Sequence, residues 1–207
     1  MLYWLQSRPD WPLPPDLMLQ LSDSTRARLA GLRPERGLQL LLGRLLLLHA
    51  ARQQLDPALQ LADLTEHPDG YPWLPAYPEC RGSISHTGEL LAVVFNPAGR
   101  CGLDIEIGRP RQFARLAEKF CPEDARWLAA GGEATASERF YQLWTLREAA
   151  YKGGWREHVV GEPPARCGTG GPLPGWDSVL LTDEVRATVV WPTTCRIEPV
   201  RLDAAGL

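Results

Sequence analysis

The chain of 207 residues is long enough for one large domain or two small ones, and its apolar content of 44% suits a globular protein with a core. A net charge of −3 argues against generic nucleic-acid binding, which needs a basic surface. Five scattered cysteines without a CxxC pair make a poor disulfide framework and a poor zinc site, so we expect a reducing cytoplasm. We expect no signal peptide, and the Leu-rich stretch 38–51 is too short and too polar to span a bilayer.

Apolar periodicity and turn residues predict helices and strands in both halves of the chain. Strands are predicted at residues 2–5, 59–64, 81–86, 90–96, 101–107, 178–181, 186–191 and 195–200. Helices are predicted at residues 22–32, 34–54, 111–120, 122–130 and 135–152, with a loop at 161–175. A capping box of Thr135 and Glu138 predicts the last helix start, and residues 97–100 predict a hairpin between two strands. The class is therefore α+β, in two units divided as residues 1–100 and 101–207.

The segment GLDIE at residues 102–106 alternates apolar and acidic residues. In a strand, this period places Asp104 and Glu106 on one face and the apolar residues on the other. Two carboxylates on one face repel each other unless a cation lies between them. The alternative is an edge strand with a solvated acidic face, which alternation alone would favour.

The segment WTLREAAYK at residues 144–152 has helical spacing, which puts Trp144, Glu148 and Lys152 on one stripe. If this stripe faces the strand, three carboxylates and an ammonium would suit Mg²⁺ and a bound phosphate. The alternative is a surface Glu–Lys pair worth about 0.2–0.5 kcal/mol. Trp144 and Tyr151 favour a partly buried face.

Two further groups could bind an anion. In SISHTG at residues 83–88, a strand delivers Ser85 and His86 to a turn, although a single histidine in a turn is usually structural. Guanidinium groups match phosphate oxygens, although an arginine cluster on a helix is often only a solvated face. The arginines near the first helices are Arg26, Arg28, Arg33, Arg36 and Arg44.

Three motifs together resemble the 4′-phosphopantetheinyl transferase family, in particular its surfactin-synthetase-activating type. The family pattern G-[IV]-D-[IVL]-E matches residues 102–106, and F-x-x-x-W-[ST]-x-[KR]-E-[AS]-x-x-K matches residues 140–152. A Ser-His-[ST] motif matches at residues 83–88, so the resemblance covers about residues 26–152. It implies two similar α+β halves in a pseudo-twofold arrangement with the active site between them, acting as a monomer.

The resemblance also implies roles for individual residues. Asp104, Glu106 and Glu148 are then the Mg²⁺ ligands at the pyrophosphate of coenzyme A, and Glu148 is also the base for the serine of an apo acyl or peptidyl carrier protein. Lys152 is the phosphate-binding lysine that stabilises the transition state. Ser85 and His86 are contacts to nucleotide phosphates, and Arg28 is a contact to the 3′-phosphate. Neither nucleic acid nor a membrane is an expected partner.

The chain departs from the family pattern where a Gly-Lys-Pro lysine normally contacts coenzyme A. Here residues 70–72 read Gly-Tyr-Pro, so that contact is missing or comes from an arginine. The segment 153–175 is also longer and richer in proline than is usual. Two alternatives stay open: a Mg²⁺-dependent phosphodiesterase, and a non-catalytic homologue that binds coenzyme A or a carrier protein. An apolar surface for a protein partner beside the site would argue against the phosphodiesterase, and its candidate residues are Phe113, Leu116 and Phe120.

Overall fold

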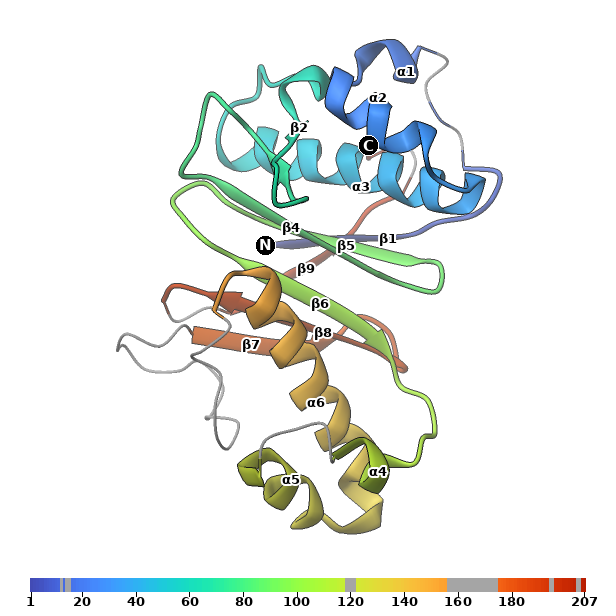
Figure 1. The fold of residues 1–207 in the computed structure, drawn as a ribbon, viewed down its shortest axis with the longest axis vertical. Helices are drawn as coiled ribbons and strands as arrows, with labels where there is room; N and C mark the ends of the chain where they lie inside the picture. Colours follow the sequence, from blue (N-terminus) through green and yellow to red (C-terminus); the bar gives the residue numbers. More distant parts are fainter. Residues whose placement is uncertain (12, 14–15, 118–121, 156–174, 194–195, 204–205) are drawn as a thin grey trace. The chain divides into compact units, whose positions relative to one another are not determined.

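The computed structural model describes residues 1–207 except 12, 14–15, 118–121, 156–174, 194–195 and 204–205 (Figure 1). It divides into unit 1, Met1–Cys101 with Glu198–Leu207, and unit 2, Gly102–Ile197. The sequence predicted a division into residues 1–100 and 101–207. The C-terminal segment instead belongs to unit 1, because its strand β9 pairs in parallel with the first strand, β1.

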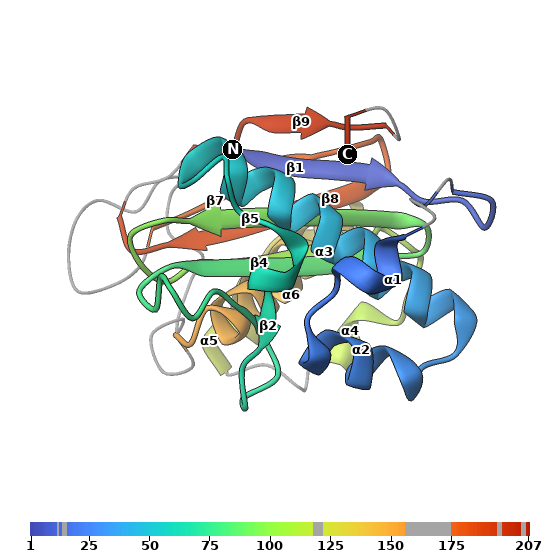
Figure 2. The same ribbon diagram turned by 90° about the horizontal axis from the view of Figure 1, so that it is seen from above.

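Unit 1 contains a four-stranded sheet in the order β4-β5-β1-β9, and helices that pack on it. The strands of this sheet are β1 (Leu2–Gln6), β4 (Arg81–Thr87), β5 (Leu90–Asn96) and β9 (Pro199–Arg201). The helices are α1 (Leu17–Gln20), α2 (Asp23–Ala30), α3 (Pro34–Gln54) and the short 3-10 helix η1 (Leu61–Asp63). A small hairpin is formed by β2 (Thr65–Glu66) and β3 (Pro72–Trp73). Figure 2 shows α3 lying along the sheet.

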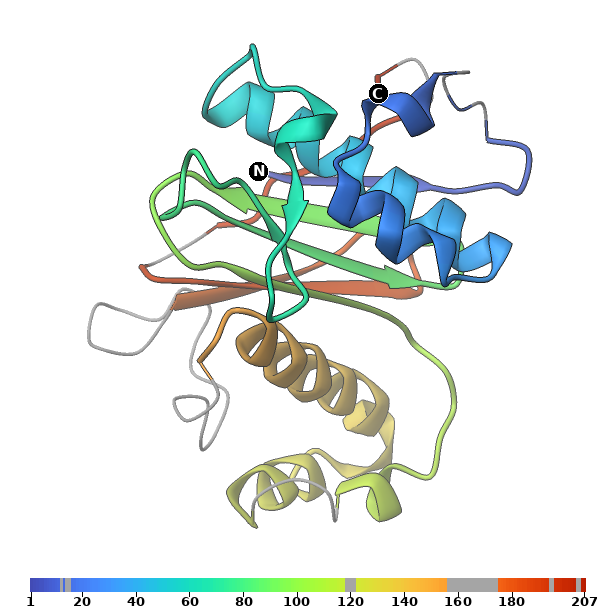
Figure 3. The ribbon, with the colours of Figure 1, turned by 45° about the horizontal axis from the view of Figure 1, so that its top comes forward.

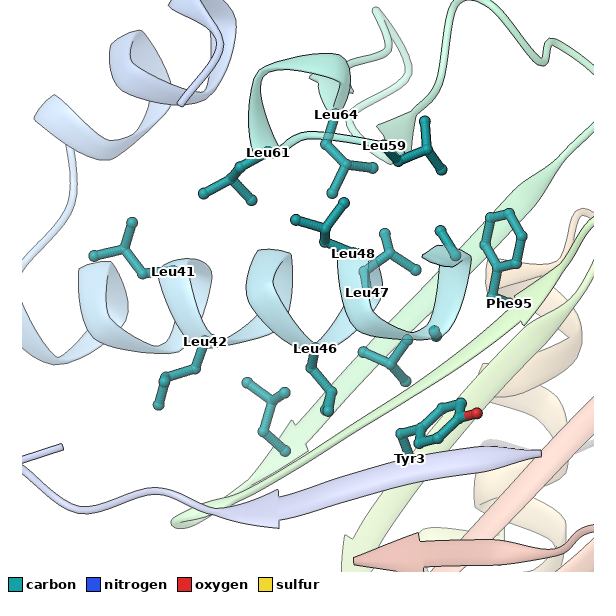
Figure 4. Packing of buried hydrophobic residues seen from close by; sticks show 14 of the residues in the cluster. Tyr3, Leu41, Leu42, Leu46, Leu47, Leu48, Leu59, Leu61, Leu64 and Phe95 are labelled. Carbon is teal, nitrogen blue, oxygen red and sulfur yellow. The ribbon is translucent and has the colours of Figure 1, made fainter. Parts of the chain in front are cut away.

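The core of unit 1 is the leucine-rich face of α3. The helix has the predicted bounds, because Pro34 occupies its first turn, where a missing N–H costs nothing. Leu42, Leu46 and Leu47 are fully buried against the sheet and the loops above it (Figure 4). None of the described helices is both long enough and apolar enough to cross a membrane.

Two local predictions in unit 1 are wrong. Residues 59–64 are not a strand, because the Gln60 and Asp63 side chains cap each other's backbone and close the turn η1. Residues 97–100 do not close a hairpin: β5 pairs with β1 and β4, whereas the following strand pairs inside unit 2. The turn therefore carries the chain from one unit to the other.

Unit 2 contains a three-stranded antiparallel sheet in the order β6-β8-β7. Its strands are β6 (Gly102–Ile107), β7 (Gly175–Leu180) and β8 (Val185–Trp191). Its helices are α4 (Phe113–Ala117), α5 (Pro122–Ala129) and α6 (Gly132–Lys152). Figure 3 shows α4 and α5 beside the N-terminal half of α6. Most of the loop predicted at 161–175, and Phe120, lie outside the described residues.

The ends of α6 test two predictions. The helix ends at Lys152, followed by Gly153 and Gly154, as predicted. The capping box is wrong, because the helix begins at Gly132 and the Thr135 hydroxyl donates to the Gly131 carbonyl at 2.6 Å. Thr135 is thus already inside the helix, and its hydroxyl donates to the backbone carbonyl four residues earlier instead of capping the first N–H groups.

Candidate active site

Asp104 and Glu106 lie on one face of β6, one of the two edge strands of the sheet of unit 2. The pairing with β8 places Asp104 opposite Thr188 and Glu106 opposite Arg186. Asp104 is 5% exposed and Glu106 is half-buried. A solvated acidic edge would leave both carboxylates in water, so the structure excludes that alternative.

Helix α6 covers the face that carries these carboxylates. Two contacts define its position. The Thr145 Oγ1 atom lies 2.6 Å from the Thr188 Oγ1 atom, and a Cβ on Gly102 would lie 1.8 Å from the Ala149 carbonyl oxygen. Gly102 and Thr188 are on the face of Asp104, by alternation along β6 and by pairing with β8. The glycine of the GLDIE segment is therefore required because the helix backbone touches the strand there.

Lys152 forms an ion pair with Asp104. Its Nζ atom donates to Asp104 Oδ1 at 2.6 Å, and the two side chains are 32% and 7% exposed. This contact joins the last turn of α6 to the middle of β6. Of the predicted stripe, Lys152 contacts the strand, and Glu148 is half-buried one turn before it. The prediction that Glu148 also faces the strand stays a prediction.

The two aromatic residues beside this stripe differ. Trp144 is half-buried and stacks on Phe140 at a centroid distance of 5.9 Å, within a cluster that α4 and α5 complete. Tyr151 is 55% exposed, so the prediction that it marks a buried face is wrong. Tyr151 is not part of the cluster that α4 and α5 form around Trp144.

Carboxylate oxygens are the donors that Mg²⁺ prefers, and Asp104, Glu106 and Glu148 supply them from a strand and from the helix that covers it. By the chemistry of the donor set, these residues fit the ion. Within the described part of the chain, no group of three His, Cys, Asp or Glu side chains is close enough together to hold a metal ion. In this arrangement the cation on Asp104 is the Lys152 ammonium. The assignment of the three ligands stays a prediction.

Unit 1 holds a second charged cluster, centred on Glu66 of β2. Arg44 of α3 is 4% exposed, and its Nη2 and Nε atoms donate to Glu66 Oε1 at 2.6 and 3.1 Å. Arg28 of α2 donates from Nη1 to Glu66 Oε2 at 2.5 Å and to the Gly70 carbonyl at 3.1 Å. Thr25 donates to the same carboxylate at 3.2 Å. Two guanidinium groups thus share one carboxylate and leave a local positive charge.

The pKa of Glu66 lies below its ordinary value. Burial alone would raise this pKa, but the charge of Arg44 and hydrogen bonds from Arg44 and Arg28 outweigh burial. A lowered pKa means that the folded state favours the ionised form, so this stabilisation is complete above the ordinary value of 4.5 and is lost as the pH falls through the lower, folded value.

We expect Glu66→Gln to lower the free energy of unfolding at pH 7 by about 3 kcal/mol, because Arg44 keeps a buried charge without its partner. Below pH 4.5, the free energy of unfolding should also fall less steeply in the variant than in wild type. Urea unfolding between pH 3 and pH 7 measures both effects. The control is Glu138→Gln, since Glu138 is 69% exposed in its pair with Arg186 and should cost under about 1 kcal/mol. Equal losses in both variants would contradict the prediction.

Ser85 and His86 both lie within β4, which continues to Thr87 before turning. They therefore lie at the end of the strand predicted at residues 81–86, and β4 ends one residue later. Adjacent residues of a strand point to opposite faces, so the two side chains do not face the same way. Ser85 is buried, whereas His86 is exposed and its Nε2 atom lies 2.8 Å from the Arg36 Nη1 atom of α3. Arg36 and His86 thus form a polar surface cluster that Ser85 does not share.

The Gly-Tyr-Pro segment packs beside an arginine. Tyr71 stacks on His67 with a centroid distance of 4.2 Å, and the Arg81 guanidinium carbon lies 5.1 Å from the Tyr71 ring centroid. The position of the expected lysine is therefore taken by Tyr71, and the guanidinium group of Arg81 lies over the Tyr71 ring. That the contact with coenzyme A is missing or comes from an arginine stays a prediction.

Sequence reasoning missed Glu66 as the partner of Arg28 and Arg44, and it missed the buried hydroxyls of Thr145 and Thr188. An arginine in the middle of a leucine-rich helix was the available signal, because a buried charge needs a partner. The partner itself is 22 residues away on a short strand that was not predicted.

Known proteins of one family resemble this chain. Residues 100–154, which contain β6, α6 and the Asp104–Lys152 pair, match the sequence model of a family described as "4'-phosphopantetheinyl transferase superfamily". A Synechocystis protein named as a 4′-phosphopantetheinyl transferase is 31% identical over 149 residues, which is 69% of this chain and 60% of the relative. The 4′-phosphopantetheinyl transferase of Bacillus subtilis is 30% identical over 114 residues, which is 54% of this chain and 50% of the relative.

The chain thus spans 60% and 50% of the lengths of these two relatives. The family match includes both motifs, at residues 102–106 and 140–152. Over the segment that carries the candidate site, the chain is therefore similar to the 4′-phosphopantetheinyl transferase superfamily.

Proposed function

We propose that this protein transfers the 4′-phosphopantetheine group of coenzyme A to a serine of an apo acyl or peptidyl carrier protein, in a Mg²⁺-dependent reaction. The observation that carries the proposal is the ion pair of Lys152 with the buried Asp104, on the carboxylate-bearing face beneath α6. This pair lies inside the segment that matches the family.

Phosphoryl transfer needs positive charge beside the phosphoryl oxygens and a base beside the attacking hydroxyl. Lys152 carries an ammonium that is one-third exposed, so it can reach a bound phosphate while Asp104 fixes its position. Glu148, one helical turn earlier and half-buried, is the group that would accept the proton of the attacking serine. Asp104 and Glu106 complete the set of hard oxygen donors.

In the proposed step, the serine oxygen forms a bond to the β-phosphorus of coenzyme A, and its proton passes to Glu148. The bond from that phosphorus to the bridging oxygen breaks, and its electron pair leaves with 3′,5′-adenosine diphosphate. Mg²⁺, when bound by Asp104, Glu106 and Glu148, would offset charge on the pyrophosphate oxygens. Lys152 would stabilise the charge that develops on the transferred phosphoryl group.

The positive cluster of unit 1 suits the nucleotide end of the same substrate. The Arg28 side chain is 44% exposed, and its contacts with Glu66 and Gly70 leave guanidinium donors for another acceptor. We therefore keep Arg28 as the proposed contact to the 3′-phosphate. We also keep His86, together with its neighbour Arg36, and Ser85 as proposed contacts to nucleotide phosphates.

We expect Arg28→Ala to remove the preference for coenzyme A over its 3′-dephospho form. A charge-assisted bond contributes about 1.5–3 kcal/mol, so the KM for coenzyme A should rise about 10- to 100-fold while that for the dephospho form stays unchanged. Michaelis constants for both substrates measure this. The control is Arg8→Ala, an exposed arginine outside the cluster. An equal rise for both substrates would show that Arg28 acts elsewhere.

The proposed function is tested by intact-mass spectrometry of apo carrier proteins incubated with the protein, coenzyme A and Mg²⁺. We expect a gain of one phosphopantetheine on the carrier, none with EDTA, and none on a carrier whose acceptor serine is alanine. Hydrolysis of coenzyme A without carrier modification would instead favour the phosphodiesterase. Binding of coenzyme A with neither reaction would favour the non-catalytic homologue.

A further inference from the structure

Three buried hydroxyls connect α6 to the sheet of unit 2. Thr145 of α6 and Thr188 of β8 are both 0% exposed, and Ser178 of β7 is 1% exposed. The oxygens of Thr145 and Thr188 are 2.6 Å apart, and those of Thr188 and Ser178 are 3.1 Å apart. Arg186 donates from Nη1 to Ser178 at 3.0 Å. The hydroxyls therefore form a continuous chain from the helix across two strands.

This hydroxyl chain, Thr145–Thr188–Ser178, adjoins the candidate site at two of its members, Thr188 and Thr145. Thr188 is the cross-strand partner of Asp104 in the β6–β8 register. Thr145 precedes Glu148 by three residues and Lys152 by seven, so all three lie on one side of α6. A shift of α6 along the sheet would thus move Glu148 and Lys152 relative to Asp104 and break the hydroxyl bond.

Other contacts between α6 and the sheet constrain this position less sharply. The helix meets the strands through small and apolar residues, among them Gly102, Ala149, Leu146 and Val190. Apolar contact is non-directional, whereas a hydroxyl–hydroxyl bond weakens steeply with distance and angle. The Thr145 hydroxyl also lies 2.8 Å from the Tyr141 carbonyl oxygen within α6, so in another register it would keep that bond but lose its contact with the sheet. Besides the Lys152–Asp104 and Arg186–Glu138 ion pairs, the hydroxyl chain is thus the directional part of this interface.

We infer that the Thr145–Thr188–Ser178 chain is a positioning device for the transfer reaction: it sets the register of α6 over β6 so that Glu148 and Lys152 face Asp104 and Glu106. This inference rests on the proposed function. Thr145 is then a positioning residue, which acts on the metal and the phosphate only through the side chains that it aligns.

The test compares Thr145→Val, which keeps the shape and removes the hydroxyl, with Thr145→Ser, which keeps the hydroxyl. The first readout is the dissociation constant of Mn²⁺ for the protein in the presence of coenzyme A, measured by electron paramagnetic resonance. The second is the Mg²⁺ concentration that gives half the maximal transfer rate. We expect Thr145→Val to raise the dissociation constant and the half-maximal Mg²⁺ concentration about tenfold each, because residues that orient metal ligands affect metal affinity by about this much. In Thr145→Ser both values should stay within about twofold of wild type.

The control is Val185→Ala. Val185 is buried in β8 on the face opposite α6, so this variant destabilises the same unit without touching the hydroxyl chain. It should lower the unfolding midpoint and leave both metal readouts unchanged. If Thr145→Val does not fold, Ser178→Ala at the outer end of the chain replaces it, with an expected rise of about threefold.

A wild-type protein that neither transfers nor binds Mn²⁺ would overturn the proposed function and the inference with it. A wild-type protein that transfers, with unchanged metal readouts in Thr145→Val or in its replacement Ser178→Ala, would overturn the inference alone. Equal metal effects in Thr145→Val and Val185→Ala would also overturn it, because they would reflect stability and not alignment.

Discussion

Replacing Asp104 with asparagine is expected to reduce transfer by at least about a hundredfold and to leave the protein folded. Asparagine keeps the size of the side chain but loses the charge that holds Lys152 and the oxygen that would bind Mg²⁺. The unfolding free energy should fall by only about 1 kcal/mol, since the one-third exposed Lys152 can be hydrated instead. Repulsion between Asp104 and Glu106 would make the fold more stable without one of them, but the ion pair of Asp104 with Lys152 offsets that repulsion.

Transfer rates and urea unfolding of the same preparation measure this result. The matched control is Asp177→Asn, because Asp177 is also 5% exposed and lies in the same sheet, but on the opposite face. There it accepts from the backbone N–H groups of Ser178 and Ile197 at 2.9 Å. This control should lose stability and retain transfer. Wild-type transfer by Asp104→Asn would remove Asp104 from the site.

Gly102→Ala is expected to have the largest effect on folding, a loss of about 3 kcal/mol or more. Its new methyl group would lie 1.8 Å from the Ala149 carbonyl oxygen and 2.9 Å from the Gly153 backbone nitrogen. Backbone atoms of a helix cannot turn aside as a flexible side chain can. The helix must therefore move away from β6, which would separate Lys152 from Asp104.

Chemical denaturation of the whole protein, monitored by tryptophan fluorescence, measures this loss in the free energy of unfolding. Gly108→Ala serves as the control, because a Cβ there would meet only the Glu184 carbonyl oxygen at an ordinary 3.4 Å. That variant should stay within about 0.5 kcal/mol of wild type. Similar stabilities for the two variants would show that α6 does not contact β6 at Gly102.

Elements with local signals were predictable from the sequence. Proline at the start and a regular apolar face defined α3, and paired glycines defined the end of α6. Alternation placed Asp104 and Glu106 on one face of a strand, and helical spacing placed Lys152 on the side that faces it. In these segments, the local backbone preference and the buried face agree.

Features that depend on distant partners were not predictable. A turn between two strands does not reveal whether they pair with each other, and β5 and β6 pair with other strands. The parallel pairing of β9 with β1 joins the two ends of the chain, which no local pattern encodes.

The same limit applied to the sites. In the sequence, Arg44 was interpreted only as one of a cluster of arginines, and only the fold brings Glu66 to it. The closeness of Thr188 to Thr145, across 43 residues of sequence, likewise follows from the register of β8 on β6. Gly102 read as part of a motif, and the helix backbone that requires it was visible only in the structure.

The central claim is that the Lys152 ammonium, fixed by Asp104, stabilises the transferred phosphoryl group. Single-turnover transfer from coenzyme A to an apo carrier protein by wild type and Lys152→Arg tests it most directly. A guanidinium keeps the charge but is larger and planar, so it cannot occupy the position of the ammonium 2.6 Å from Asp104 and present the same charge to the phosphate. We predict a rate about a hundredfold below wild type with normal folding, whereas a near-normal rate would show that Lys152 only pairs with Asp104 and takes no part in transfer.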